Sequence, residues 1–371
     1  MTVRNAAMFN GNRLKLGIFA QNCSSGMAAT RVPERWDASW ENNLALARMA
    51  DEAGIEFLLP IARWRGYGGE TDFEGETLET LTWACGLLAH TKRINAFGTV
   101  HAPMVHPIFA AKQMITIDHI SRGRFGLNLV CGWNSDEFEM FGIEQFDHDT
   151  RYAYGEEWLG AVRQLWSYDE PFGFEGDFIR LTNAISKPGP FEGRPPLVMN
   201  AGSSEVGRRF GARNCDMLFT RFVDVDSARR EITAIRAAAA EVGREVSVYT
   251  ATYVVVRESR AEADDYHHHY AVEMEDTEAV DHLTQMHGLH TRSLKPAEYQ
   301  RYRQRYAAGH GCYPVVGTPD HAADVFAAIS EAGFDGTTIS FVNYLNEFPA
   351  FVADVLPRLT ARGLRQPLAR H

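Results

Sequence analysis

Short apolar runs alternate with helical patterns along most of this chain. Most runs are continuous stretches of Val, Ile, Leu and Phe, which is typical of parallel strands buried on both faces. The strands predicted in this way are Leu14–Ala20, Glu56–Ile61, Ile94–Val100, Arg124–Val130, Leu197–Ala201, Met217–Phe222, Ser247–Val256 and Thr337–Val342.

Helical patterns separate these strands, as the crossovers of a parallel sheet require. Ser39 and Thr318 are expected to cap two of the helices, and Pro319 suits a first helical position. The predicted helices are Ser39–Ala53, Glu76–His90, Pro107–Ile120, Tyr152–Trp166, Ser204–Arg213, Ser227–Val242, Pro319–Ala332 and Asn346–Leu359.

The order of elements predicts an α/β fold of the (β/α)8 TIM-barrel type, as one domain over residues 1–371. A doubly wound open sheet is the alternative, because eight βα units alone do not prove closure. Two segments look inserted. Phe172–Leu181 is predicted to form a hairpin, and Glu258–Gly311 a lid-like excursion that closes over one end of the fold.

Charge and composition argue against several kinds of binding partner and cellular setting. Net charge is -11, from 37 basic and 48 acidic residues, which argues against a nucleic-acid partner. No apolar run reaches the roughly 20 residues of a membrane helix. The five cysteines are far apart and odd in number, which argues against a disulfide framework and favours a reducing cytoplasm.

Polar residues stand at the ends of two buried strands, where a barrel enzyme keeps its chemistry. Thr99 and His101 end one strand, and Asn128 lies within the next, which runs into Cys131 and Trp133. A buried Asn must find hydrogen-bond partners. Neighbouring backbone is one such partner and a bound ligand is the other, and Thr99 has the same two interpretations.

Ala201–Gly207 follows an apolar strand and opens a helix. A helix N-terminus offers unpaired N–H groups and partial positive charge to an anion, and Gly202, Ser203 and Ser204 allow close approach. An ordinary capped helix explains the same residues. If Arg151 and Tyr152 lie near Ser204 in space, the group makes a phosphate clamp.

Three other polar segments give weaker evidence of a functional site. Glu137, in an acidic stretch, is interpreted as a solvated charge. The run His267–His269 is a poor metal tripod because adjacent helical residues point in different directions, so no metal site is expected. The loop 65–70 contains a GxG without the setting of a dinucleotide fingerprint, and we expect it to contact a ligand as a flexible loop.

Several segments together resemble the luciferase-like, flavin-dependent monooxygenases, and most closely the pyrimidine oxygenase and dimethylsulfone monooxygenase branch. The resemblance runs from Leu14 to about Leu359. Its motifs are RxRGYGG at 63–69, TIDxISxGRFGxNLVxGW at 116–133, the spacing of Glu137 to Arg151-Tyr152, AGSS at 201–204 and VGTPDHAADVF at 316–326.

The resemblance implies FMN at the carboxyl ends of the strands. Ile61 and Ala62 would lie against the isoalloxazine ring, and Thr99 and Asn128 would line the face where oxygen meets it. Glu137 would sit near the flavin. The phosphate would be bound by residues of the two segments singled out above: Arg151, Tyr152, Gly202, Ser203 and Ser204.

The substrate pocket implied by the resemblance includes Trp133, Cys131 and His101. Pyrimidine oxygenase carries a lysine in place of Ala62 and a threonine in place of Cys131, and His101 replaces a small residue. These departures lie near the expected pocket and leave the substrate open among amides, heterocycles, sulfones and halogenated aromatics.

The activity implied is that of a two-component monooxygenase, in which a separate NAD(P)H-dependent reductase supplies FMNH2. Reduced flavin reacts with O2 to give a flavin peroxide, at N5 in the resembling branch or at C4a, which attacks a small organic substrate. The family also implies a homo-oligomer, a dimer or tetramer. A deazaflavin-dependent oxidoreductase and a non-catalytic flavin-binding protein are the alternatives on the same fold.

Overall fold

Eight parallel strands close into a barrel in the computed structural model, which describes residues 7–202, 204–288 and 296–367. The ring closes because β9 pairs with both β8 and β11. The strands in ring order are β1 (Lys15–Phe19), β2 (Phe57–Leu59), β3 (Asn95–His101), β4 (Phe125–Val130), β7 (Leu197–Asn200), β8 (Met217–Phe219), β9 (Ser247–Val256) and β11 (Gly336–Ser340). The predicted barrel is confirmed, and the open sheet is wrong.

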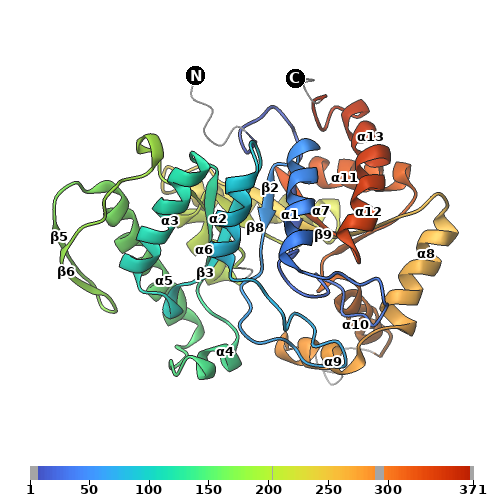
Figure 1. Cartoon of the computed structure of the whole chain (residues 1–371), viewed down its shortest axis with the longest axis horizontal. Coiled ribbons are helices and arrows are strands. Elements are labelled where there is room, and N and C mark those ends of the chain that lie inside the picture. The colour runs from blue at the N-terminus through green and yellow to red at the C-terminus, as the bar shows by residue number, and fades with distance from the viewer. Residues whose placement is uncertain (1–6, 203, 289–295, 368–371) are drawn as a thin grey trace.

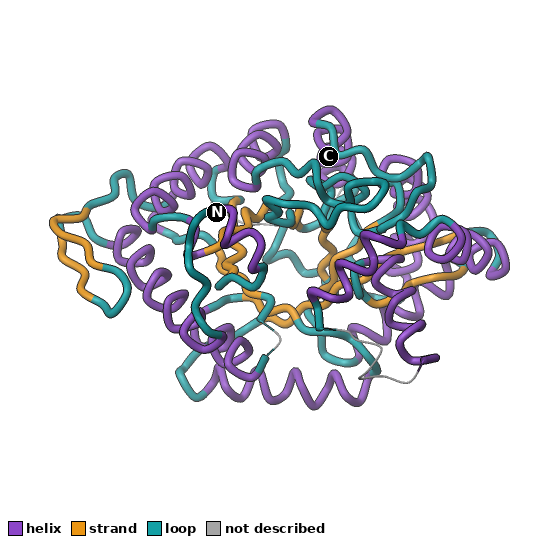
Figure 2. The backbone as a smooth tube through the Cα atoms, turned by 90° about the horizontal axis from the view of Figure 1, so that it is seen from below, coloured by secondary structure: helices purple, strands orange, loops and turns teal. Residues whose placement is uncertain are grey.

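Helices surround the strands, as the view from below shows (Figure 2). Ser39 caps the first helix by accepting a hydrogen bond from the Asn42 amide, and Thr318 caps α11 through the His321 amide, as predicted. The main helices are α1 (Trp40–Glu52), α2 (Thr80–His90), α3 (Pro107–Ser121), α5 (His148–Ser167), α6 (Glu205–Asn214), α7 (Val225–Ala240), α11 (Pro319–Glu331), α12 (Tyr344–Ala350) and α13 (Leu356–Ala361). Among the described residues, no helix has the length and apolar character needed to span a bilayer.

The sequence did not predict strand β10 (Tyr313–Gly317). It pairs in parallel with residues 252–256 of β9, beyond the stretch of β9 that β8 covers. Such pairing is possible because β9 has ten residues and β8 only three. The strand is short and contains Pro314, which obscures a strand pattern and suits an edge.

Both inserted segments form elements of their own. The hairpin is confirmed as β5 (Phe172–Glu175) and β6 (Arg180–Ala184), and it stands at the left edge of Figure 1. The longer insertion contains α8 (Arg260–His268), a π-helical turn (His269–Glu273), α9 (Thr277–Met286) and α10 (Pro296–Gly309), at the lower right. The short helix α4 (Ser135–Met140), at the bottom, was not predicted.

Aromatic rings fill the interior of the barrel. Phe57 meets Phe97 and Tyr249 edge-on, with ring centroids 5.8 and 5.7 Å apart. Strand glycines leave room for these rings, because a Cβ on Gly126 would come within 2.3 Å of the Phe97 ring and one on Gly17 as close to Phe57. Such glycines mark close approach rather than a turn.

This packing predicts that Gly126→Ala destabilises the barrel. The added methyl group overlaps a ring that is itself wedged against Phe57, so we expect a loss of about 1–3 kcal/mol in the free energy of unfolding, measured with urea. Gly160→Ala in α5 is the matched control, since a Cβ there has its nearest neighbour at 3.9 Å. A loss no larger than the control's would contradict this packing.

Candidate active site

A cavity of about 490 Å³ opens at the carboxyl ends of the strands. Its size suits a small organic ligand or cofactor. Its walls come from the ends of β4, β7 and β8, the start of α5, and residues 310–313 at the end of the insertion. The insertion therefore covers the end of the barrel that holds the cavity, as the sequence predicted, and this end is where barrel enzymes carry out their chemistry.

One wall is built on the N-terminus of α6. Ser204 caps the helix by accepting a hydrogen bond from the Gly207 amide at 3.0 Å. The Tyr152 hydroxyl packs over the same turn, because a Cβ on Gly202 would lie 2.8 Å from it and one on Gly207 only 2.5 Å. The two glycines thus leave room for Tyr152 against the first turn of α6, which we call the cradle, and a helix N-terminus of this kind attracts anions.

The structure brings Tyr152 and Ser204 together, as the phosphate clamp requires. Burial raises the pKa of the Tyr152 hydroxyl, and a hydrogen bond with Ser204 opposes that shift. Arg151 donates through Nη1 to the Gly132 carbonyl, while its buried Nε has no partner among the described residues. Ser203, predicted for the same role, lies outside the described residues.

Asn128 lies on the cavity wall and is hydrogen-bonded to Thr99 behind it. The Asn128 amide donates to the Thr99 hydroxyl at 3.1 Å, and this hydroxyl donates to the Pro60 carbonyl at 2.7 Å. Asn128 lines the cavity and is 8% exposed, yet its Oδ1 has no partner within the described part of the chain. A buried acceptor left without a donor is costly and points to a ligand that supplies one.

Seven of the predicted site residues line the cavity: Asn128, Cys131, Trp133, Arg151, Tyr152, Gly202 and Ser204. Others lie behind or beside it. Ile61 is tied through its backbone N–H and carbonyl to the Asn22 side chain, with Ala62 next along the chain. Thr99 reaches the cavity through Asn128, and His101 ends β3 almost fully buried, with an unpartnered Nδ1 among the described atoms.

The interpretation of Glu137 as a solvated charge is wrong. Its carboxylate is fully buried and accepts hydrogen bonds from the Trp64 amide at 2.9 Å and Arg63 Nη1 at 3.3 Å. Arg63 also pairs with buried Glu74 at 3.0 Å. A buried carboxylate needs such partners. The unpredicted α4 carries Glu137 inward, and this tertiary placement leaves no trace in an acidic stretch of sequence.

Glu74 links this network to the insertion. His310, after α10, places Nδ1 3.0 Å from the second oxygen of Glu74. Burial pushes the pKa of Glu74 upward, but the charges of His310 and Arg63 hold it below its usual value. The loop 65–70 is part of the same assembly, with Tyr67 buried against Arg63, and it does not line the cavity. Part of the loop is therefore buried in this assembly, and its contact with a ligand stays a prediction.

Sequence reasoning missed the cavity residues of the insertion and of the end of β8. His287 stacks on Trp133 with ring centroids 5.1 Å apart, and Arg221, Arg305 and His310 complete this part of the wall. The sequence marked the insertion as rich in His and Arg. Only the fold selects which of them reach the cavity. They lie up to 179 positions from Cys131 along the chain, and no local pattern of residues reports contacts over such a distance.

Buried His101 predicts a stability that falls in acid. Burial, with the charge of Arg63, lowers its pKa to about 4. Below pH 6.5 the His101 side chain binds a proton in the unfolded chain but not in the folded chain. The folded state is therefore most stable above that pH, and its free energy of unfolding falls as pH drops toward 4. Urea unfolding should lose about 2–3 kcal/mol more between pH 7 and pH 4.5 in the parent than in His101→Gln. Parallel pH profiles for the two proteins would refute this.

Comparison with known proteins identifies the class. The luciferase-like monooxygenase model matches residues 14–336, so the chain belongs to that family. It is 30% identical over 351 residues to an FMNH2-dependent dimethylsulfone monooxygenase of Pseudomonas fluorescens, covering 93% of this chain and 94% of that one.

Two further relatives agree with this result. Pyrimidine monooxygenase RutA of Cronobacter turicensis is 29% identical, covering 94% of this chain and 93% of its own. The solved structure of DmoA from Hyphomicrobium sulfonivorans superimposes with a TM-score of 0.86 at 20% identity, over 97% of this chain and 90% of that one. The predicted resemblance is confirmed, and the chain is a member of a monooxygenase family.

Proposed function

We propose that this chain is the oxygenase of a two-component system, which uses FMNH2 from a separate NAD(P)H-dependent reductase and O2 to oxygenate or cleave a small organic substrate. The observation that carries the proposal is the cavity itself, which joins an anion cradle at α6 to an unpartnered Asn128 at the end of β4. The FMNH2-dependent relative supports it.

The residues present suit FMN at both ends of the cavity. The ribityl phosphate would take the amides at the start of α6, the Ser204 and Tyr152 hydroxyls and the Arg151 guanidinium. These groups combine helix-dipole, neutral and charge-assisted hydrogen bonds. The free Oδ1 of Asn128 accepts a hydrogen bond from an N–H group of a ligand, and an isoalloxazine ring carries such groups. The residues therefore fit the cofactor.

Reduced FMN, when bound, supplies the electrons that activate O2. The protein would contribute by orienting the reacting groups and by keeping water away from them. The hydrogen bond to Thr99 holds the Asn128 amide in one orientation, which also fixes the place of its unpartnered oxygen. Trp133, stacked on His287, and residues 310–313 line the cavity and would shield the reacting groups from water once the ligands are bound. The sequence offers no dinucleotide fingerprint, which favours a reductase on another chain.

The phosphate cradle predicts a selective loss of FMN binding. Arg151→Gln should weaken FMN by about tenfold or more and leave riboflavin within about twofold, because riboflavin lacks the phosphate. Fluorescence titration measures both. Arg209→Gln is the control, an exposed arginine whose partner is Glu205 on the outside of α6. Equal losses for FMN and riboflavin would contradict a phosphate site here.

We expect Asn128→Ala to uncouple oxygen consumption from product formation. Removing the amide leaves FMN held at its phosphate end but takes away the oriented group at the end of β4. Oxygen consumption should therefore continue while product per oxygen consumed falls by about tenfold. An oxygen electrode and product analysis give the ratio. A ratio equal to the parent's would remove Asn128 from the reaction.

The test of the function is aerobic incubation with FMN, a flavin reductase and a panel of amides, heterocycles, sulfones and organic acids. Mass spectrometry under labelled O2 should show an oxygen atom in a product. Substrate turnover with a reduced deazaflavin and no need for O2 would place the chain among deazaflavin enzymes instead. Binding of FMN with no turnover across the panel would favour a non-catalytic role.

A further inference from the structure

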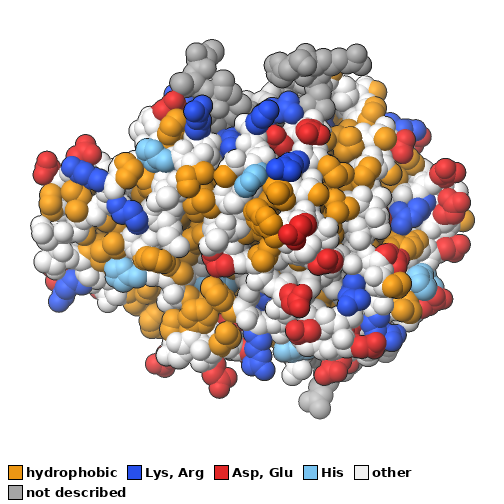
Figure 3. Space-filling view, viewed as in Figure 1, with side chains coloured by type: hydrophobic (Ala, Val, Ile, Leu, Met, Phe, Trp, Pro, Cys, Tyr) orange, Lys and Arg blue, Asp and Glu red, His pale blue; other side chains and the backbone are white. Residues whose placement is uncertain are grey.

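The charge of the cavity is opposite to that of the protein. The chain carries a net charge of -11, and acidic and basic side chains are interspersed over the face in Figure 3. Among the described residues that line the cavity, three are arginines and none is Asp or Glu. A concave site of one sign raises the local concentration of ligands of the opposite sign.

The arginines stand at two separate poles. Arg151 belongs to the cradle with Tyr152 and is the arginine whose charge acts on the Tyr152 hydroxyl. Arg221 and Arg305 lie at the other pole, where the charges of both act on Cys312 and Tyr306. The phosphate of FMN accounts for the first pole. The second pole, with Arg221 and Arg305, has no anionic group assigned to it by the cofactor.

No carboxylate of the described residues forms an ion pair with either arginine of the second pole. Arg305, on α10, donates through Nε to the Cys312 carbonyl at 2.8 Å, and its guanidinium lies 5.5 Å from the centre of the Tyr313 ring. Arg221 follows β8 and is exposed. The nearby buried Glu74 is already bound by Arg63 and His310. Both arginines therefore keep donors available to a ligand.

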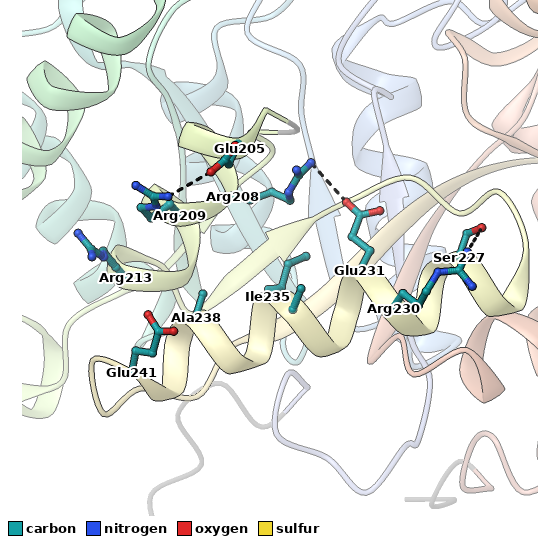
Figure 4. Close-up of a pocket in the computed structure, with 11 residues that line it drawn as sticks. Glu205, Arg208, Arg209, Arg213, Ser227, Arg230, Glu231, Ile235, Ala238 and Glu241 are labelled. Atoms are coloured by element: carbon teal, nitrogen blue, oxygen red, sulfur yellow. Dashed lines mark hydrogen bonds and ion pairs between the residues drawn. The ribbon is translucent and has the colours of Figure 1, made fainter.

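Arginines in the groove between α6 and α7 form ion pairs with acidic residues, unlike those of the second pole. There Arg209 pairs with Glu205 at 3.2 Å and Arg208 with Glu231 at 3.7 Å (Figure 4). The same close-up shows Glu241 on the wall with Arg213. Arginines of the groove thus alternate with acids, and those of the cavity do not.

His287 lies in the field of this second pole. Burial, then the charges of His310 and Arg221, lowers its pKa to about 3, so the ring is neutral near pH 7. It stacks on Trp133, and the two rings line the cavity together with the arginines. The pole thus combines fixed positive charge with a flat aromatic wall.

We propose that the substrate of this chain is an organic anion, a carboxylate or sulfonate, held at its charged group by Arg221 and Arg305 with its carbon skeleton against Trp133 and His287. Guanidinium groups suit planar and tetrahedral oxyanions because they present paired donors. The proposal rests on the proposed function, since it takes the first pole to be the site of the FMN phosphate. Dimethylsulfone, named for one relative, is uncharged, so this pole would set the chain apart.

Calorimetry on the FMN-loaded protein tests the proposal with matched probes: benzoate against benzamide, and benzenesulfonate against benzenesulfonamide. At least one anion should bind about tenfold or more tightly than its neutral partner, and the preference should shrink as salt rises. Arg221→Gln and Arg305→Gln should each remove that preference, and the FMN dissociation constant should stay within about twofold. Arg305→Lys, which keeps the charge, should retain part of it.

Arg209→Gln serves as the control and should leave every probe unchanged. Three results overturn the proposal: equal binding of anion and neutral partner, no anion binding at millimolar concentration, or an FMN affinity that falls by about tenfold in Arg221→Gln. The last would assign the second pole to the cofactor. Because these are binding measurements, any of the three results would remove the anion proposal alone. The monooxygenase proposal is tested separately, by turnover with FMN and O2.

Discussion

Closure of the parallel ring is the constraint on which the rest depends. Strand β9 closes the ring by pairing with both β8 and β11, and because every neighbouring pair in the ring is parallel, all eight strands run in one direction. All carboxyl ends therefore meet at one rim. Asn128 from β4, the glycine turn after β7 and Arg221 after β8 come from distant parts of the chain and share one cavity only because the ring closes.

A buried network of charges fastens the insertion over that rim. Arg63 pairs with Glu74 and Glu137, and Glu74 also holds His310 at the end of the insertion. Charges this deep are expensive unless they are paired, so the network is stable as a whole and costly to break at one member. It commits the loop after β2 to structure and places His310 at the cavity wall, which connects the position of the lid to the shape of the site.

Inside the cavity the two ends differ in chemistry. The cradle is the first turn of α6, where the glycines leave room for the Tyr152 hydroxyl and the helix dipole is positive. The opposite pole is made of side chains from β8 and the insertion. Under the two proposals above, the cradle would bind the cofactor and the insertion would contact the substrate, so the two roles would be separated in space.

Local patterns determined the eight barrel strands, most helices, two caps, the hairpin and the segments that hold Asn128, Tyr152 and Ser204, because hydrophobic period and turn chemistry are written in neighbouring residues. They did not determine β10, which can pair with β9 only because β9 extends beyond the residues that pair with β8. Nor did they determine the burial of Glu137, the Glu74–His310 link or the Arg221–Arg305 pole. Those depend on which distant segments meet, and contacts between charges far apart in sequence are decided by tertiary packing alone.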